Sequence, residues 1–204
     1  MNPKSREDST MADLAAATPI TPPPQADSVQ LATTQTIALA EIRTRREHDL
    51  LGDADVPADA YWGVHTLRAV GNFPITGVPV GHFPEFVRAL ALVKQAAARA
   101  NRRLGNLPAA KAEVIERACD LIALEGRFHD QFVVDAVQGG AGTSTNMNAN
   151  EVIANVALEL MGKARGDYAA LHPNDDVNMA QSTNDAYPTA LRLAVIFATE
   201  PMIA

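Results

Sequence analysis

Apolar residues in the second half of the chain recur at the spacing that places side chains on one face of an α-helix. The first such segment begins at Pro84, which suits a first helical position, and ends near Gly105, which suits a position just past a helix. Four segments follow this pattern: residues 84–105, 108–124, 145–162, and a last one from Ser182 or Pro188 to the end of the sequence. The pattern therefore predicts a mainly α-helical protein.

Residues 43–81 lack this periodicity. Proline and glycine interrupt the segment too often for long elements, at Pro57, Gly63, Gly71, Pro74, Gly77, Pro79 and Gly81. We expect short strands or a hairpin around Ala69 to Ile75. The aromatic residues Tyr61, Trp62 and Phe73 are expected to pack against the core.

Residues 1–42 are rich in proline, alanine and threonine and contain no aromatic residue. Such a segment buries too little apolar surface to offset the entropy of ordering, so we expect a disordered tail. The remainder is predicted to form a domain at 43–181 and the start of a helical domain at 182–204. Because the apolar pattern continues to Ala204, we interpret the sequence as the N-terminal portion of a longer, truncated protein.

The charge and the cysteine content of the sequence limit the classes of function that it fits. The formal net charge is −7 and the isoelectric point about 5.2, which disfavours a nucleic-acid-binding protein. The only cysteine, Cys119, lies within a predicted helix and is expected to be a buried, inert thiol. No signal peptide and no apolar run of membrane-spanning length is evident, so a soluble, cytoplasmic protein without membrane partners is expected.

Two polar stretches at the starts of predicted helices carry the candidate chemistry. The first polar segment, residues 139–150, reads GGAGTSTNMNAN; the second polar segment, residues 181–185, reads QSTND. Glycine lets a backbone approach a ligand closely, and free N–H groups at a helix N-terminus attract anions. Each hydroxyl could alone be a helix cap, but each segment offers more hydrogen-bonding groups than a cap uses. A small bound anion would satisfy them.

Other chemistries fit the sequence less well. Residues 139–145 lack the lysine of a Walker-type phosphate loop and the third glycine of a dinucleotide-binding fingerprint. His172, Asp175 and Asp176 lack further spaced metal ligands, so a hydrogen-bonded turn is the simpler interpretation. No serine lies in a nucleophile elbow. We therefore expect no metal and no cofactor.

Longer motifs resemble one enzyme family. Residues 140–152 (GAGTSTNMNANEV) and 172–189 (HPNDDVNMAQSTNDAYPT) strongly resemble the fumarase/aspartase superfamily. Residues 49–52 and 56–69 (VPADAYWGVHTLRA) look like the start of an aspartase. Ala141, Ser144-Thr145 and Thr183 match aspartases better than class II fumarases, whereas Trp62 is the fumarase-like residue.

The resemblance implies site residues. Thr143, Ser182 and Thr183 would hold the β-carboxylate of L-aspartate, and Asn184 would contact the amino group. Two basic residues match positions linked to activity in aspartases, Arg68 and Lys94. Three residues match an accessory anion site of fumarases that is not thought to be catalytic: His172, Asn174 and Asp175.

The resemblance also implies a fold, an assembly and a reaction. The fold would be the short-stranded N-terminal domain of this superfamily plus the start of its long-helix bundle, within a homotetramer. The reaction would be reversible deamination of L-aspartate to fumarate and ammonia through an enediolate, without a cofactor. The general-base serine of the family lies beyond the matched motifs, so no catalytic residue is assigned here and the chain alone is expected to be inactive. The alternatives are a class II fumarase and a non-catalytic truncated lyase module.

Overall fold

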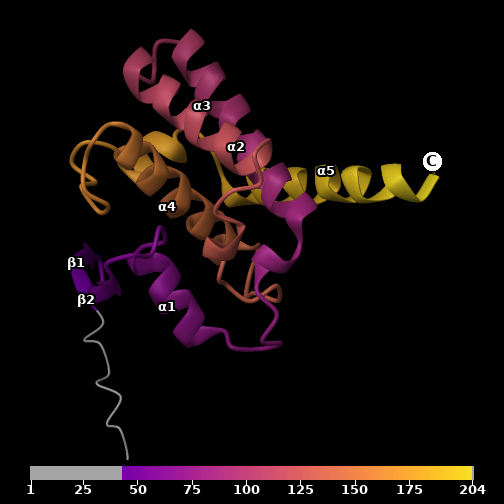
Figure 1. Ribbon diagram of the computed structural model, residues 1–204, viewed down its shortest axis with the longest axis horizontal. Coiled ribbons are helices and arrows are strands. Elements are labelled where there is room, and N and C mark those ends of the chain that lie inside the picture. Colours follow the sequence, from indigo (N-terminus) through magenta and orange to yellow (C-terminus); the bar gives the residue numbers. More distant parts are fainter. Residues whose placement is uncertain (1–42, 204) are drawn as a thin grey trace, which may run out of the picture. The chain divides into compact units, whose positions relative to one another are not determined.

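The computed structural model describes residues 43–203, and this part of the chain is mainly helical (Figure 1). The predicted disordered tail at 1–42 lies outside the described residues. The strands and α-helices are β1 (Thr44–Asp49), β2 (Gly52–Pro57), α1 (Val64–Asn72), α2 (Pro84–Arg103), α3 (Ala109–Ala123), α4 (Thr143–Leu160) and α5 (Thr183–Ile203). Three short turns complete them: 3₁₀ turns η1 (Val80–His82) and η2 (His129–Gln131), and the π turn η3 (Pro173–Val177).

The four predicted helices are confirmed as α2, α3, α4 and α5. Pro84 is the first residue of α2, where its missing N–H leaves no helical bond unmade. Gly105 follows the end of α2 with a φ of +75°, and the N–H of Asn106 donates to the carbonyl of Asn101 at 2.9 Å. This left-handed glycine satisfies a carbonyl that the helix end would otherwise leave free.

The strands expected around Ala69 to Ile75 were wrong, because α1 covers most of that segment. The hairpin lies earlier, where β1 and β2 pair antiparallel with Thr44 opposite Pro57 and Asp49 opposite Gly52. The strand sequences TRREHD and GDADVP show no apolar alternation, so the strand pattern was absent. Cross-strand ion pairs such as Arg46–Asp53, at 2.9 Å, accompany the pairing instead.

Helix α4 is the centre of the core. Every residue from Thr145 to Leu158 is buried, and α4 packs against α1, α3 and α5. Helix α2 packs along both α3 and α5, as the crossing of these helices in Figure 1 illustrates. Tyr61 and Trp62 pack against this core, as predicted, and Cys119 is fully buried within it. Phe73 does not join the core; its half-buried ring lies beside Gly139 instead. The proposed boundary at residues 181–182 stays a prediction.

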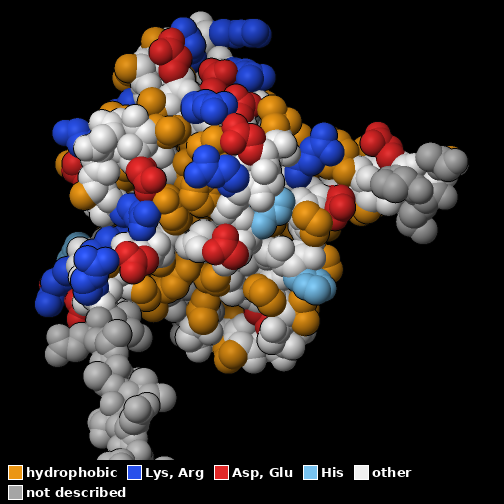
Figure 2. Space-filling model, viewed as in Figure 1, with side chains coloured by type: hydrophobic (Ala, Val, Ile, Leu, Met, Phe, Trp, Pro, Cys, Tyr) orange, Lys and Arg blue, Asp and Glu red, His pale blue; other side chains and the backbone are white. Residues whose placement is uncertain are grey.

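Charged side chains of both signs share the surface of α2 and α3 (Figure 2). Lys and Arg side chains are interspersed with Asp and Glu over α2 and α3 on the face shown in Figure 2. Ion pairs link these two helices, including Arg99–Glu116 at 2.7 Å and Arg102–Glu113 at 2.9 Å. Between residues 43 and 203, no helix combines the length and the apolar character needed to cross a membrane.

Candidate functional site

The first polar segment includes the glycine-rich turn that precedes α4. Gly140 and Gly142 have φ values of +70° and +83°, a region in which residues with a Cβ are strained. A Cβ on Gly142 would overlap the ring of Tyr187, which belongs to α5. Two separate features therefore require glycine at residue 142: the backbone conformation and the packing of α5 against this segment.

The second polar segment begins α5. The hydroxyl of Ser182 accepts a hydrogen bond from the N–H of Asn184 at 3.2 Å, so Ser182 acts as a cap. Thr183 is half-buried, whereas Ser182 and Asn184 are exposed. Thr143, the first residue of α4, is exposed as well. The predicted hydroxyl groups are thus accessible to solvent in this chain.

The two polar segments line one cavity of about 260 Å³. Its walls come from the approach to α4 and from the first turns of α5, and the lining residues are Gln138, Gly140, Ala141, Gly142, Asn184, Tyr187 and Pro188. Asn184, expected from the resemblance to contact an amino group, is one of them. The structure therefore brings the two segments together, but Thr143, Ser182 and Thr183 are not among the residues that line this cavity.

Lys94 lies beneath the two polar segments rather than in the cavity. It is fully buried on α2, and its ammonium donates to the side-chain oxygens of Asn146, Asn178 and Gln181 at 2.6, 2.8 and 3.0 Å. Burial lowers the pKa of Lys94 to about 7. Three protein oxygens therefore engage the ammonium of Lys94, and its predicted link to activity stays a prediction.

Arg68 contacts the hairpin. Its guanidinium donates to both oxygens of Asp49, at 2.8 and 2.9 Å, and to the carbonyl of Gly52 at 2.9 Å. The hydrogen bond from Arg68 holds the pKa of the Asp49 carboxyl below its usual value. Among the described residues, these contacts connect α1 to the β1–β2 turn, and none of them reaches the two polar segments.

The segment at 172–176 is a hydrogen-bonded turn. The His172 ring accepts hydrogen bonds through Nδ1 from the N–H groups of Asn174 and Asp175, both at 3.2 Å, while Asn174 and Asp175 themselves are exposed. Asp176 is buried and accepts from Lys111 and from the N–H of His172, both at 2.7 Å. The carboxylate of Asp176 is therefore engaged by protein donors.

Sequence reasoning did not single out Asn178 or Glu151, and it placed Asn146 and Gln181 in the polar segments without assigning either a role. Asn146, Asn178 and Gln181 bind Lys94, and Glu151 is fully buried on α4. The available signal was the set of polar residues at positions 146, 148, 150 and 151, in a helix whose next turns are largely apolar. A polar group on a helix buried on all sides must find an internal partner.

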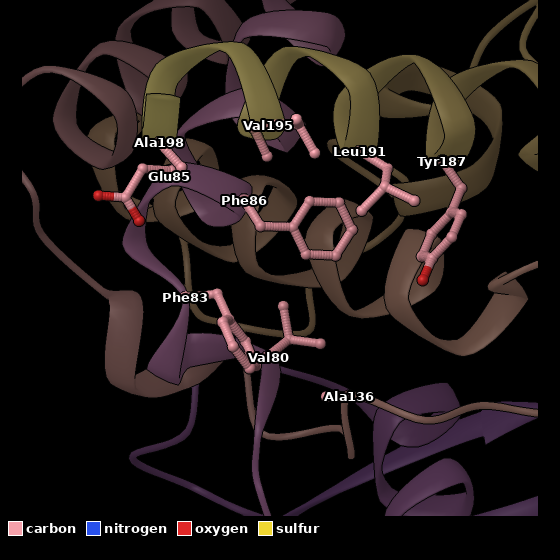
Figure 3. A pocket seen from close by; sticks show the side chains of 10 residues that line it. Val80, Phe83, Glu85, Phe86, Ala136, Tyr187, Leu191, Val195 and Ala198 are labelled. Atoms are coloured by element: carbon pink, nitrogen blue, oxygen red, sulfur yellow. The ribbon is translucent and has the colours of Figure 1, made fainter. Parts of the chain in front are cut away.

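A second, apolar groove of about 280 Å³ separates the start of α2 from α5. Figure 3 shows Tyr187, Leu191 and Val195 of α5 facing Phe86 and Val80. The rings of Phe86 and Tyr187 meet edge to face, with centroids 5.5 Å apart. This lining offers few hydrogen-bonding groups, so the groove does not suit a dicarboxylate.

Comparison with solved structures identifies the class of fold. The chain superimposes with a TM-score of 0.75 and 60% identity on a fumarate lyase:delta crystallin from Brucella melitensis, covering 77% of this chain and 36% of that one. A class II fumarase from Schistosoma mansoni gives a TM-score of 0.72 at 36% identity, covering 77% and 33%. The described residues therefore form a domain of the fumarate lyase fold.

The chain belongs to the lyase family, whose model matches residues 52–203. It is 63% identical over 161 residues to the aspartate ammonia-lyase of Pseudomonas aeruginosa, covering 79% of this chain and 34% of the relative. It is 58% identical over 151 residues to that of Escherichia coli, covering 74% and 32%. The chain thus spans about a third of the length of these relatives.

Proposed function

We propose that the chain supplies part of the substrate site of an aspartate ammonia-lyase, which converts L-aspartate to fumarate and ammonia. The observation that carries the proposal is identity of 58–63% to aspartate ammonia-lyases. Identity to the class II fumarase is 36%, which favours deamination over the alternative, hydration of fumarate to malate. The cavity shared by the two polar segments has room for a small substrate, and Asn184 is the proposed site residue in its lining.

The proposed chemistry needs no cofactor. A base removes the proton next to the β-carboxylate, the electron pair forms an enediolate, and the C–N bond then breaks to release ammonia. The enediolate carries more negative charge than the carboxylate, so donors directed at it lower the barrier. Hydroxyls of Thr143, Ser182 and Thr183, with the N-termini of α4 and α5, would supply those donors. Asn184 would orient the amino group.

We propose further that deamination requires chain beyond these 204 residues, including the general-base serine. The test measures the ultraviolet absorbance of fumarate after L-aspartate is added to this chain and to a version extended by its downstream coding sequence. Only the extended version is expected to form fumarate. Fumarate released by this chain alone would refute the requirement, and fumarate formed from malate but not from aspartate would favour the fumarase.

Site residues are tested in the extended protein. Ser182→Ala and Thr143→Val remove single donors to the enediolate, so each is expected to lower kcat by about 10²–10³-fold. Thr44→Val, on the exposed edge of β1, makes the same chemical change away from the cavity and is expected to leave kcat unchanged. Full activity of both site variants would refute the assigned roles.

The proposal extends to assembly as a homotetramer. Helix α5 exposes apolar side chains along its length, at Leu191, Val195, Ile196 and Ile203. Exposed apolar helix faces of this kind are usually covered by other helices. Light scattering of the extended protein is expected to give the mass of four chains, and a monomeric mass would refute the assembly.

A further inference from the structure

Lys94 is a fully buried cation whose partners are neutral. Its three ammonium hydrogens are matched by three amide oxygens, on Asn146, Asn178 and Gln181. Among the described residues, no carboxylate pairs with it. A buried charge without a counter-ion is costly, so these three hydrogen bonds are what holds the ammonium in the core.

The partners of Lys94 belong to both polar segments. Asn146 lies in the first turn of α4, within the first polar segment, and Gln181 is the first residue of the second. Asn178 connects them, because its Oδ1 also accepts a hydrogen bond from Nδ2 of Asn146 at 3.0 Å. One side chain of α2 therefore joins the starts of α4 and α5.

The backbone next to this contact is strained. Ala180 has a φ of +55°, in the left-handed region that residues with a Cβ rarely adopt. The turn around it is held by Nδ2 of Asn178, which donates to the carbonyl of Gln181 at 3.1 Å, and by Asn101 of α2, which donates to the carbonyl of Met179 at 2.9 Å. Such strain persists only where surrounding contacts enforce it.

We propose that Lys94 is a positioning residue: its ammonium fixes the second polar segment against the first, so that the backbone at Ser182 and Thr183 depends on the charge of Lys94. The inference rests on the proposed function only in taking these segments as the substrate site. Loss of one proton leaves a lone pair facing an amide oxygen. The contact with Gln181, the longest of the three, is expected to open first.

Two other titratable groups bear on the test. Cys119 faces Lys94 from α3, and burial raises the pKa of its thiol, so it stays neutral in the relevant range. His172 precedes η3, which leads into Asn178, so its imidazole is the second titratable group to control for. The groups directed at Lys94 from α4 and from residues 178–181 are the three amides already named.

The experiment is a pH titration of this chain by nuclear magnetic resonance, without substrate. It follows the Cε carbon of Lys94, the side-chain amides of Asn146 and Asn178, and the backbone amides of Ser182 and Thr183. All are expected to shift with one midpoint near pH 7. The transition is expected to remain in His172→Gln and to be lost in Lys94→Met.

Each alternative result overturns the inference. A transition at Ser182 and Thr183 that survives in Lys94→Met belongs to another group. Backbone amides that stay fixed while Lys94 titrates would make Lys94 a structural cross-link only. If Lys94→Met fails to fold, a difference between the Lys94 midpoint and the Ser182 midpoint in the unaltered chain is equally decisive. Because no substrate is present, none of these results depends on which reaction the enzyme catalyses.

Discussion

The carboxylate of Glu151, in the middle of α4, accepts a hydrogen bond from the backbone N–H of Gly63 at 2.8 Å. It also accepts from the N–H groups of His65 and Thr66, at 2.9 and 3.1 Å. Glu47 of β1 accepts from the remaining N–H, that of Val64, at 2.8 Å. Helix α1 has no capping side chain of its own, so two distant carboxylates satisfy its N-terminus.

Replacing Glu151 tests this long-range cap. Glu151→Leu leaves three N–H groups, two of them buried, without acceptors and is expected to lower the free energy of unfolding by about 3 kcal/mol. Glu151→Gln keeps one acceptor oxygen and is expected to lose less. Urea unfolding followed by circular dichroism measures both. Equal losses in the two variants would show that the hydrogen bonds to this side chain contribute nothing.

The same contact explains what sequence reasoning could and could not find in the fold. Helices α2 to α5 could be predicted from apolar periodicity and from local signals at helix ends, such as Pro84 and Gly105. Helix α1 has no such signals, because its cap comes from Glu151, 88 residues further along the chain than Gly63. The β1–β2 hairpin was missed because charged residues dominate both strands.

The candidate site, too, was predictable from the sequence only in part. The two polar segments were found from their composition, and the structure places both at one cavity. The environment of Lys94 was not predictable, since Asn146, Asn178 and Gln181 lie 52, 84 and 87 residues away in sequence. The contact of Arg68 with Asp49 was not predictable either, because Asp49 belongs to the hairpin that was missed.

Gly63 is expected to tolerate no side chain. An added Cβ would lie 2.5 Å from an oxygen of Glu47, 2.5 Å from the hydroxyl of Tyr168 and 2.9 Å from an oxygen of Glu151. Gly63→Ala should therefore lower the free energy of unfolding by about 1–3 kcal/mol. Gly71→Ala is the matched control in the same region, because nothing lies within 4 Å of its added Cβ. In α1 it should stabilise by about 0.5–1 kcal/mol. Thermal unfolding compares them, and equal effects would contradict the packing argument.

Asp135 should make stability depend on acid pH. Burial opposes its ionisation, but hydrogen bonds from the N–H groups of Val137, Thr76 and Gly77 and from the Thr76 hydroxyl hold its pKa well below the usual value. A carboxyl with a lowered folded-state pKa contributes stability above about pH 4, its unfolded value, and loses it as the pH falls. Asp135→Asn should unfold at lower urea at pH 7, and the difference should shrink towards acid pH. A difference independent of pH would contradict this assignment.

Lys94 should make the free energy of unfolding depend on pH in the neutral to alkaline range. Because its pKa in the folded chain is about 7, the unfolded chain binds more protons at this residue between about pH 7 and 10. Stability therefore rises with pH across that interval, by about 2–4 kcal/mol relative to Lys94→Met. The raised pKa of Cys119 lowers stability at high pH in both proteins, so comparing them isolates the lysine. Parallel urea midpoints for the two proteins from pH 7 to 10 would contradict the prediction.

The buried thiol of Cys119 can report on transient opening of the helical core. It is the only cysteine in the sequence, and its side chain is fully enclosed within the core, to which α2, α3 and α4 contribute. A thiol reagent can reach it only while α3 separates from its neighbours, so the rate of labelling measures how often that separation occurs. One native atom thus records, without any added probe, how substitutions at Gly63, Lys94 or Glu151 change the lifetime of the closed core.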